Sequence, residues 1–148
     1  MDKIGIGQTG VIGEETTKKL MEFIDLHIGT SFVEILDFLK SEGIEVEGKY
    51  ALEPKENVIY WSGLSDIICN YFIGLIDDKK IIPIPCHIII YMCDGRGLAL
   101  PIAKKFKGYK TPHWIPITFY TPIGIKKHCP KLAKKISKWH PERWGTLK

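Results

Sequence analysis

The sequence has few of the features that mark secreted, membrane-spanning or metal-binding proteins. It holds four cysteines, at spacings that form neither a disulfide framework nor a C-x-x-C motif. Its longest apolar stretch, residues 81–93, is broken by Pro83, Pro85 and His87, and a membrane-spanning helix needs roughly 18 apolar residues. Residues 1–20 are polar and rich in glycine, unlike a signal peptide. We therefore expect a cytoplasmic protein with free thiols and no membrane partner.

Arginine is also scarce, and the basic residues are unevenly distributed. Only Arg96 and Arg143 are arginines among 21 basic residues. Residues 1–100 carry a net charge of −7, whereas residues 101–148 carry +11 and a single acid, Glu142. This asymmetry favours a polyanion or an acidic protein as partner of the C-terminal region. The alternative is that the lysines only keep the surface soluble.

A formal G-x-G-x-x-G motif occurs at residues 5–10. In a dinucleotide-binding fold these glycines follow a buried strand and open a helix onto the pyrophosphate. Here only Met1–Ile4 precede the motif, which is too short for a central strand, and no series of βαβ units follows. We therefore expect residues 1–13 to form a flexible N-terminal arm and expect no cofactor.

Helical periodicity and capping signals predict two consecutive helices after this arm. Apolar residues recur at helical spacing over residues 14–28, and the acidic residues at the start of this segment interact favourably with the dipole of a helix. Ser31 and Glu34 then have the spacing of a capping box, which opens a second helix through Lys40. Strands are expected at residues 44–49 and 58–61. Ser65 is expected to cap a third helix over residues 66–78.

The second half of the chain is predicted to be rich in strands. Residues 81–93 and 98–103 suggest a hairpin that turns at Asp94-Gly95, with Pro83 and Pro85 implying an edge strand. A further strand is expected over residues 114–120, a loop over residues 122–127, and a helix from Pro130 to Trp139.

Residues 31–103 resemble a winged helix domain. The resemblance rests on the turn Gly63-Leu64-Ser65, a following helix with Leu75 near its end, a strand starting at Ile81 and the hairpin at Asp94-Gly95. In that family the helix enters the major groove and the hairpin wing touches the DNA backbone. The solvent face of this helix, however, offers Asp66, Asn70, Asp77 and Asp78, which would repel phosphates. The resemblance therefore implies the fold, while the reading helix is not expected to read DNA.

The Lys-rich C-terminal region is the candidate nucleic-acid interface. Its lysines neutralise phosphates, and the interleaved Phe106 and Tyr109 have faces that stack on unpaired bases. Arg96, at the tip of the predicted hairpin, is expected to reach a groove. The predicted phosphate-contacting residues are Arg96, Lys104, Lys105, Lys107, Lys110, Lys126, Lys127, Lys131, Lys134, Lys135 and Lys138. The alternative is that Trp114, Phe119 and Trp139 belong to the core and the lysines form an ordinary solvated face.

Metal binding and catalysis receive less support from the sequence. Cys86, His87, Cys93, His113, His128 and Cys129 are ligand types, but no two have metal-ligand spacing, so we expect no metal. No nucleophile motif such as G-x-S-x-G is present.

The sequence therefore predicts an α+β fold with three parts: an arm (residues 1–13), a winged-helix-like domain with an N-terminal helical pair (residues 14–103), and a basic strand-helix extension (residues 104–148). Non-catalytic nucleic-acid binding is the leading functional hypothesis. A protein-interaction or assembly module, which includes pairing with copies of itself, is the main alternative, and an enzyme of unknown type is the third.

Overall fold

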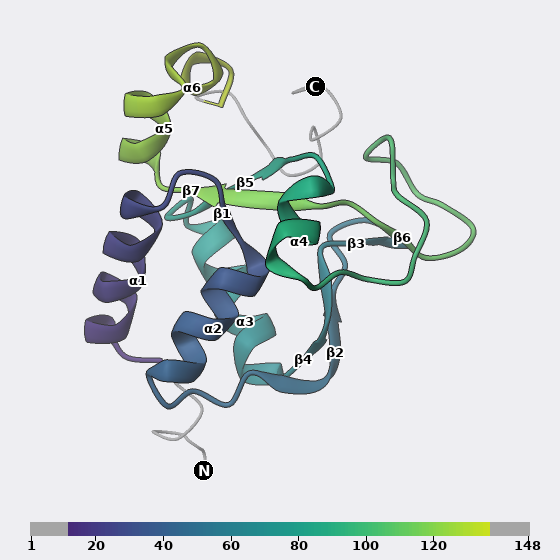
Figure 1. The fold of residues 1–148 in the computed structure, drawn as a ribbon, viewed down its shortest axis with the longest axis horizontal. Helices are drawn as coiled ribbons and strands as arrows, with labels where there is room; N and C mark the ends of the chain where they lie inside the picture. The colour runs from purple at the N-terminus through teal and green to yellow at the C-terminus, as the bar shows by residue number, and fades with distance from the viewer. Residues whose placement is uncertain (1–11, 137–148) are drawn as a thin grey trace.

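The computed structural model describes residues 12–136, with side chains through Lys134. Its elements, in chain order, are α1 (Glu14–Leu26), β1 (Thr30–Ser31), α2 (Phe32–Ser41), β2 (Glu47–Leu52), β3 (Val58–Ile59), β4 (Trp61–Leu64), α3 (Asp66–Asp77), β5 (Ile82–Pro85), α4 (Ile89–Asp94), β6 (His113–Trp114), β7 (Ile117–Tyr120), α5 (Pro122–His128) and α6 (Pro130–Ile136). This mixture of helices and small, mainly antiparallel sheets confirms the predicted α+β class (Figure 1). Of the predicted arm, only Ile12 and Gly13 are among the described residues, so the glycine motif lies outside them.

The three predicted helices of the first half are confirmed, and so are the caps that start two of them. The Ser31 side chain accepts from Glu34 N while the Glu34 side chain accepts from Ser31 N, which completes the predicted capping box of α2. Ser65 caps α3 by accepting from Ile68 N. Helix α2 then buries Phe32, Ile35 and Leu39 against the core. Short polar side chains at these positions therefore set where the apolar helices begin.

The main sheet has the strand order β1-β7-β5, with both neighbouring pairs antiparallel. Strand β7 comes from the segment predicted as the basic extension, so that segment supplies the central strand. Pro83 and Pro85 lie in β5, which pairs with β7 on one side within the described sheet. Proline is tolerated there because an edge strand has one row of amides without a ladder partner, which confirms the predicted edge position.

A second small sheet, β2 with β4, lies between α2 and α3 in the sequence. Its register shifts within β2, because the chain bulges between Glu47 and Ala51. Strand β2 begins at Glu47 rather than at residue 44 as predicted, and the strand predicted at residues 58–61 is divided between β3 and β4. Strand β3 pairs in parallel with β6.

Large aromatic side chains form the centre of the core. Phe32 contacts Phe72 and Phe119, with ring centroids 4.8 and 4.9 Å apart, and Trp61 stacks on Tyr91 at 5.4 Å. Trp114 meets both Trp61 and Tyr91 edge to face. These rings come from α2, α3, α4, β4, β6 and β7, so one aromatic cluster joins all three described sheets to the helices. Trp114 and Phe119 thus belong to the core, as the alternative interpretation held.

The predicted hairpin over residues 81–103 is wrong. After β5 the chain forms the short helix α4, which Gly95 ends in the left-handed conformation at φ +75°. Tyr91 is the buried residue of α4, and its hydroxyl donates to Ile117 O at 2.6 Å and accepts from Phe32 N at 3.1 Å. Burying this one ring between α2 and β7 outweighs the strand propensity of the isoleucines beside it.

The loop predicted over residues 122–127 is also wrong, because these residues form α5. Thr121 caps the helix by accepting from Gly124 N, and Pro122 occupies its first turn. Lys126 and Lys127 lie in the last turn, where their positive charges interact favourably with the helix dipole. Helix α6 begins at Pro130 as predicted, whereas its predicted end at Trp139 lies outside the described residues.

Candidate nucleic-acid interface

The predicted phosphate-contacting lysines lie in two separate groups. The first is the loop of residues 104–110, hereafter the basic loop, which exposes Lys104, Lys105, Lys107 and Lys110. The second is the α5–α6 pair, which exposes Lys126, Lys127, Lys131 and Lys134. Figure 1 places α5 and α6 at the upper left of the molecule and the loop that contains residues 104–110 at the far right. Lys138 and the side chain of Lys135 lie outside the described part of the chain.

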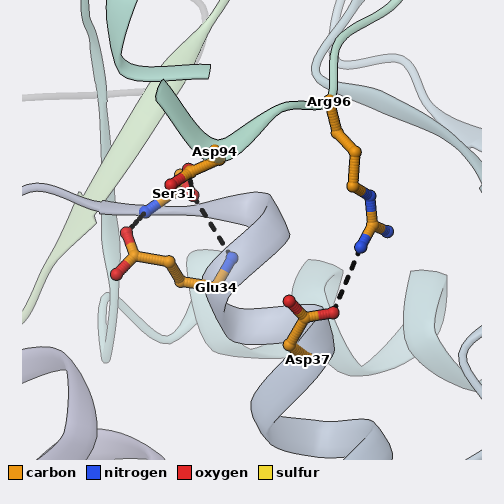
Figure 2. A network of polar contacts seen from close by, with 5 residues as sticks. All are labelled: Ser31, Glu34, Asp37, Asp94 and Arg96. Atoms are coloured by element: carbon orange, nitrogen blue, oxygen red, sulfur yellow. Dashed lines mark hydrogen bonds and ion pairs between the residues drawn. The ribbon is translucent and has the colours of Figure 1, made fainter. Parts of the chain in front are cut away.

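Arg96 belongs to neither group of lysines, and its side chain forms an ion pair on α2. It follows α4 rather than occupying a hairpin tip, and its Nη1 is 3.2 Å from Asp37 Oδ1 on α2 (Figure 2). The two side chains are 50% and 63% exposed, so the pair is a surface ion pair. Pairs of this kind contribute about 0–1 kcal/mol to stability. The Arg96 guanidinium is therefore directed to the Asp37 carboxylate. The prediction that Arg96 lies at the tip of a hairpin was wrong.

Tyr109 organises the basic loop from within. Its hydroxyl accepts hydrogen bonds from the backbone amides of Lys104 and Lys105, each at 3.2 Å. Phe106, which is 9% exposed, packs inward between the exposed lysines. The buried Phe106 ring thus anchors the loop to the protein, and the Tyr109 hydroxyl holds the backbone of Lys104 and Lys105.

The C-terminal part of the basic loop is attached to the turn before β3. Tyr109 N donates to Glu56 O at 3.1 Å, and Asn57 Nδ2 donates to Tyr109 O at 2.8 Å. His113 N then donates to Asn57 O at 2.7 Å. These three bonds order a loop that has no regular secondary structure, so its lysines project from a fixed backbone.

The basic loop carries positive charge, and the turn that holds it contains the acids Glu53 and Glu56. Residues 98–112 contain no Asp or Glu. A Cβ added at Gly108 would lie 3.5 Å from Glu56 Oε1, and Glu53 Oε2 accepts from Asn57 N at 2.6 Å. The four lysines of the loop outnumber these two carboxylates and leave an excess of positive charge, which attracts polyanions.

Two half-buried aromatic rings adjoin the lysines. The rings of Tyr109 and His113 stack with centroids 3.9 Å apart and planes at 21°. Lys107 Nζ lies 5.8 Å from the centroid of the Tyr109 ring, in cation–π range. The sequence did not predict this stack, because Tyr109 lies four residues before His113 in an irregular loop.

The exposed face of α3 is acidic, as the sequence predicted. Asp66, Asn70, Asp77 and Asp78 are all exposed, and Lys79 and Lys80 follow only after the helix. Carboxylates along this face oppose the approach of phosphates. The basic loop is therefore the better candidate surface for nucleic acid.

Two further observations concern metal ligands and a polar cavity among the described residues. Among residues 12–134, no three His, Cys, Asp or Glu side chains are arranged to hold a metal ion. A cavity of about 350 Å³ next to Arg96 is lined by charged and polar groups, among them Asp37, Lys40 and Glu47. The ion pair of Arg96 with Asp37 borders this cavity. Activation of a nucleophile requires a general base beside a side chain such as serine or cysteine, and this ion pair does not provide that arrangement.

No family model, curated protein or solved structure matches this chain. None of the described helices has both the length and the apolar character that crossing a bilayer requires.

Proposed function

We propose that this protein binds nucleic acid without catalysis, through phosphate contacts made by the basic loop. The observation that supports the proposal is the fixed backbone of this loop, which exposes four lysines within seven residues. Contacts between lysine and phosphate release condensed counterions, which makes binding favourable and dependent on salt. A loop ordered before binding loses less conformational entropy when it meets its ligand.

The winged helix resemblance of residues 31–103 is kept as part of this proposal. Its support is limited to the helices α1, α2 and α3, which precede β5 and β7, and to the three-stranded antiparallel sheet β1-β7-β5. The basic loop lies in the connection between β5 and β7, where that family has its wing. A wing contacts the phosphate backbone, so the position of the loop agrees with its charge. Here the connection contains α4 and an irregular loop in place of a hairpin.

Fluorescence anisotropy with labelled single-stranded and duplex oligonucleotides tests the proposal. The triple variant K105Q/K107Q/K110Q removes three charges from the basic loop. The matched control K126Q/K127Q/K131Q removes three exposed charges from α5 and α6. Truncation after Ala103 is unsuitable, because it would delete β7 from the centre of the main sheet.

We expect the loop variant to bind more weakly at all salt concentrations between about 50 and 200 mM. Its slope of log K against log salt should fall by about one for each phosphate that the variant no longer neutralises. The control should keep the wild-type slope. Equal losses of affinity in both variants would mean general charge attraction, and no binding of the wild type at low salt would reject the proposal.

Self-association is a second candidate function, and the outer face of α4 favours it. Ile89 is 54% exposed and Met92 is 69% exposed on this helix, with Ile90 beside them at 36%. Adjacent exposed apolar side chains are typical of contact surfaces. Sedimentation velocity across a concentration series would detect a dimer, and Met92→Lys should abolish it. Apolar association would persist at salt concentrations that weaken binding to nucleic acid.

A further inference from the structure

The structure divides the aromatic residues near the basic loop into buried and accessible ones. Phe106 and Trp114 are 9% and 1% exposed, so their faces are covered by the protein. Tyr109 and His113 are half-buried and stacked on each other at the surface. Of the described aromatic side chains in and next to the loop, the two rings of this pair are the more exposed.

Both rings of the pair are held by specific hydrogen bonds. The Tyr109 hydroxyl is bound to two backbone amides, and His113 N is bound to Asn57 O. The His113 ring is fixed separately: its Nδ1 is 2.8 Å from Thr111 O. Because a carbonyl oxygen only accepts, Nδ1 donates this hydrogen bond. The stack therefore exists before any ligand arrives.

The surroundings of the pair suit one class of ligand. Lys107 and Lys110 flank Tyr109 in sequence, and Lys107 Nζ lies 5.8 Å from the Tyr109 ring centroid. A flat ring beside ammonium groups matches a nucleotide, whose base stacks while its phosphate pairs with a cation. A base inside a duplex has both faces covered by its neighbours, so only an unpaired base can add to the stack.

We propose that the Tyr109–His113 pair is a stacking platform for an unpaired base, so that the ligand class of the basic loop is single-stranded nucleic acid. This inference rests on the proposed function and narrows it. The lysines supply affinity for any phosphate backbone. The platform adds a contact that duplexes cannot make, and the protein therefore prefers single strands.

The test compares His113→Ala and His113→Phe with the wild type, on a single strand and on the duplex of the same sequence, at one pH and one salt concentration. Phenylalanine retains a stacking ring, whereas alanine removes it. His27→Ala is the matched control: His27 also contacts an aromatic ring, Phe23, with centroids 4.2 Å apart and planes at 32°, but at the C-terminal end of α1. Circular dichroism would establish that each variant is folded.

We expect His113→Ala to lower single-strand affinity by about five- to a hundredfold, with duplex affinity unchanged. His113→Phe and His27→Ala should bind the single strand as the wild type does. Equal wild-type binding to both strand types, with His113→Ala unaffected, would overturn the stacking platform and leave the proposed function intact. No wild-type binding to either strand would instead reject the proposed function.

A crosslinking measurement on the unmodified chain keeps the inference testable if the His113 variants fail to fold. Single strands that contain a photoreactive halogenated uracil form adducts with an aromatic ring in contact with the base. We expect the adduct on Tyr109 or His113. An adduct found only on peptides outside residues 104–113 would overturn the inference.

Discussion

Ser31 Oγ lies 2.6 Å from Asp94 Oδ2, and the same oxygen accepts from Glu34 N at 3.2 Å (Figure 2). One hydroxyl therefore caps the start of α2 and donates to the last residue of α4. Ser31 is fully buried and belongs to β1, which pairs with the central strand β7. A side chain that the sequence indicates only as a helix cap thus joins two helices and the edge of the main sheet.

Ser31→Ala should destabilise the protein by about 1–3 kcal/mol. The change removes an N-cap and leaves the Asp94 carboxylate without this donor. Chemical denaturation with urea measures the effect. Asp37→Asn is the control, because it weakens only the exposed ion pair with Arg96 and should cost under about 1 kcal/mol. Similar losses of stability in the two variants would contradict the role assigned to Ser31.

Tyr91→Phe should cost about 1–3 kcal/mol, although it removes a single oxygen. The hydroxyl donates to Ile117 O and accepts from Phe32 N, and both backbone groups would remain buried without it. Urea denaturation at neutral pH measures the loss. Tyr50→Phe is the matched control, because Tyr50 is 49% exposed, and it should leave stability nearly unchanged.

The stability difference between the wild type and Tyr91→Phe should shrink in alkali. Burial, the main cause, raises the pKa of Tyr91 far above its ordinary value of 10.0. Above pH 10 this tyrosine ionises in the unfolded chain while it stays protonated in the folded one. The wild type therefore loses up to about 1.4 kcal/mol per pH unit that the phenylalanine variant does not lose. Urea midpoints at pH 9, 10 and 11 would test this, and parallel curves would contradict it.

Gly48→Ala and Gly74→Ala should change stability in opposite directions. An added Cβ at Gly48 would lie 2.5 Å from Leu64 O, so β2 would have to move away from β4. At Gly74, within α3, nothing lies within 4 Å of an added Cβ. We expect Gly74→Ala to stabilise by about 0.5–1 kcal/mol and Gly48→Ala to destabilise by more than that. Thermal unfolding of both variants measures the two effects, and shifts of the same sign would contradict the expectation.

Cys93 should react with iodoacetamide well before Cys69 and Cys86. It is exposed at the surface of α4. Burial raises the pKa of Cys86 to about 12, and burial followed by the charge of Asp66 raises that of Cys69. The thiolate is the reactive form, so these two thiols should be labelled slowly at neutral pH. Peptide mass spectrometry after brief labelling measures the order, Cys93→Ser serves as control, and comparable labelling of all three would refute it.

Local signals in the sequence predicted the features that depend on residues close together along the chain. The Ser31–Glu34 and Ser65 caps, the start of α6 at Pro130 and the edge position of Pro83 and Pro85 were all predicted. Each depends on backbone groups within a few residues, or on the missing amide of proline. The cap of α5 was equally local, since Thr121 and Pro122 are a cap and a first-turn proline, but the prediction overlooked it.

The tertiary structure decided the features that depend on distant partners. Residues 89–94 have the composition of a strand, yet they form a helix because Tyr91 finds its partners in Phe32 and Ile117. The basic loop takes its shape from Glu56 and Asn57, and the Tyr109–His113 stack follows from that attachment. By itself, the sequence determined the class of fold, the helix starts and the excess of lysine in the C-terminal region. Long-range packing determined which lysines share a surface, because the spacing of residues along a chain does not specify their neighbours across it.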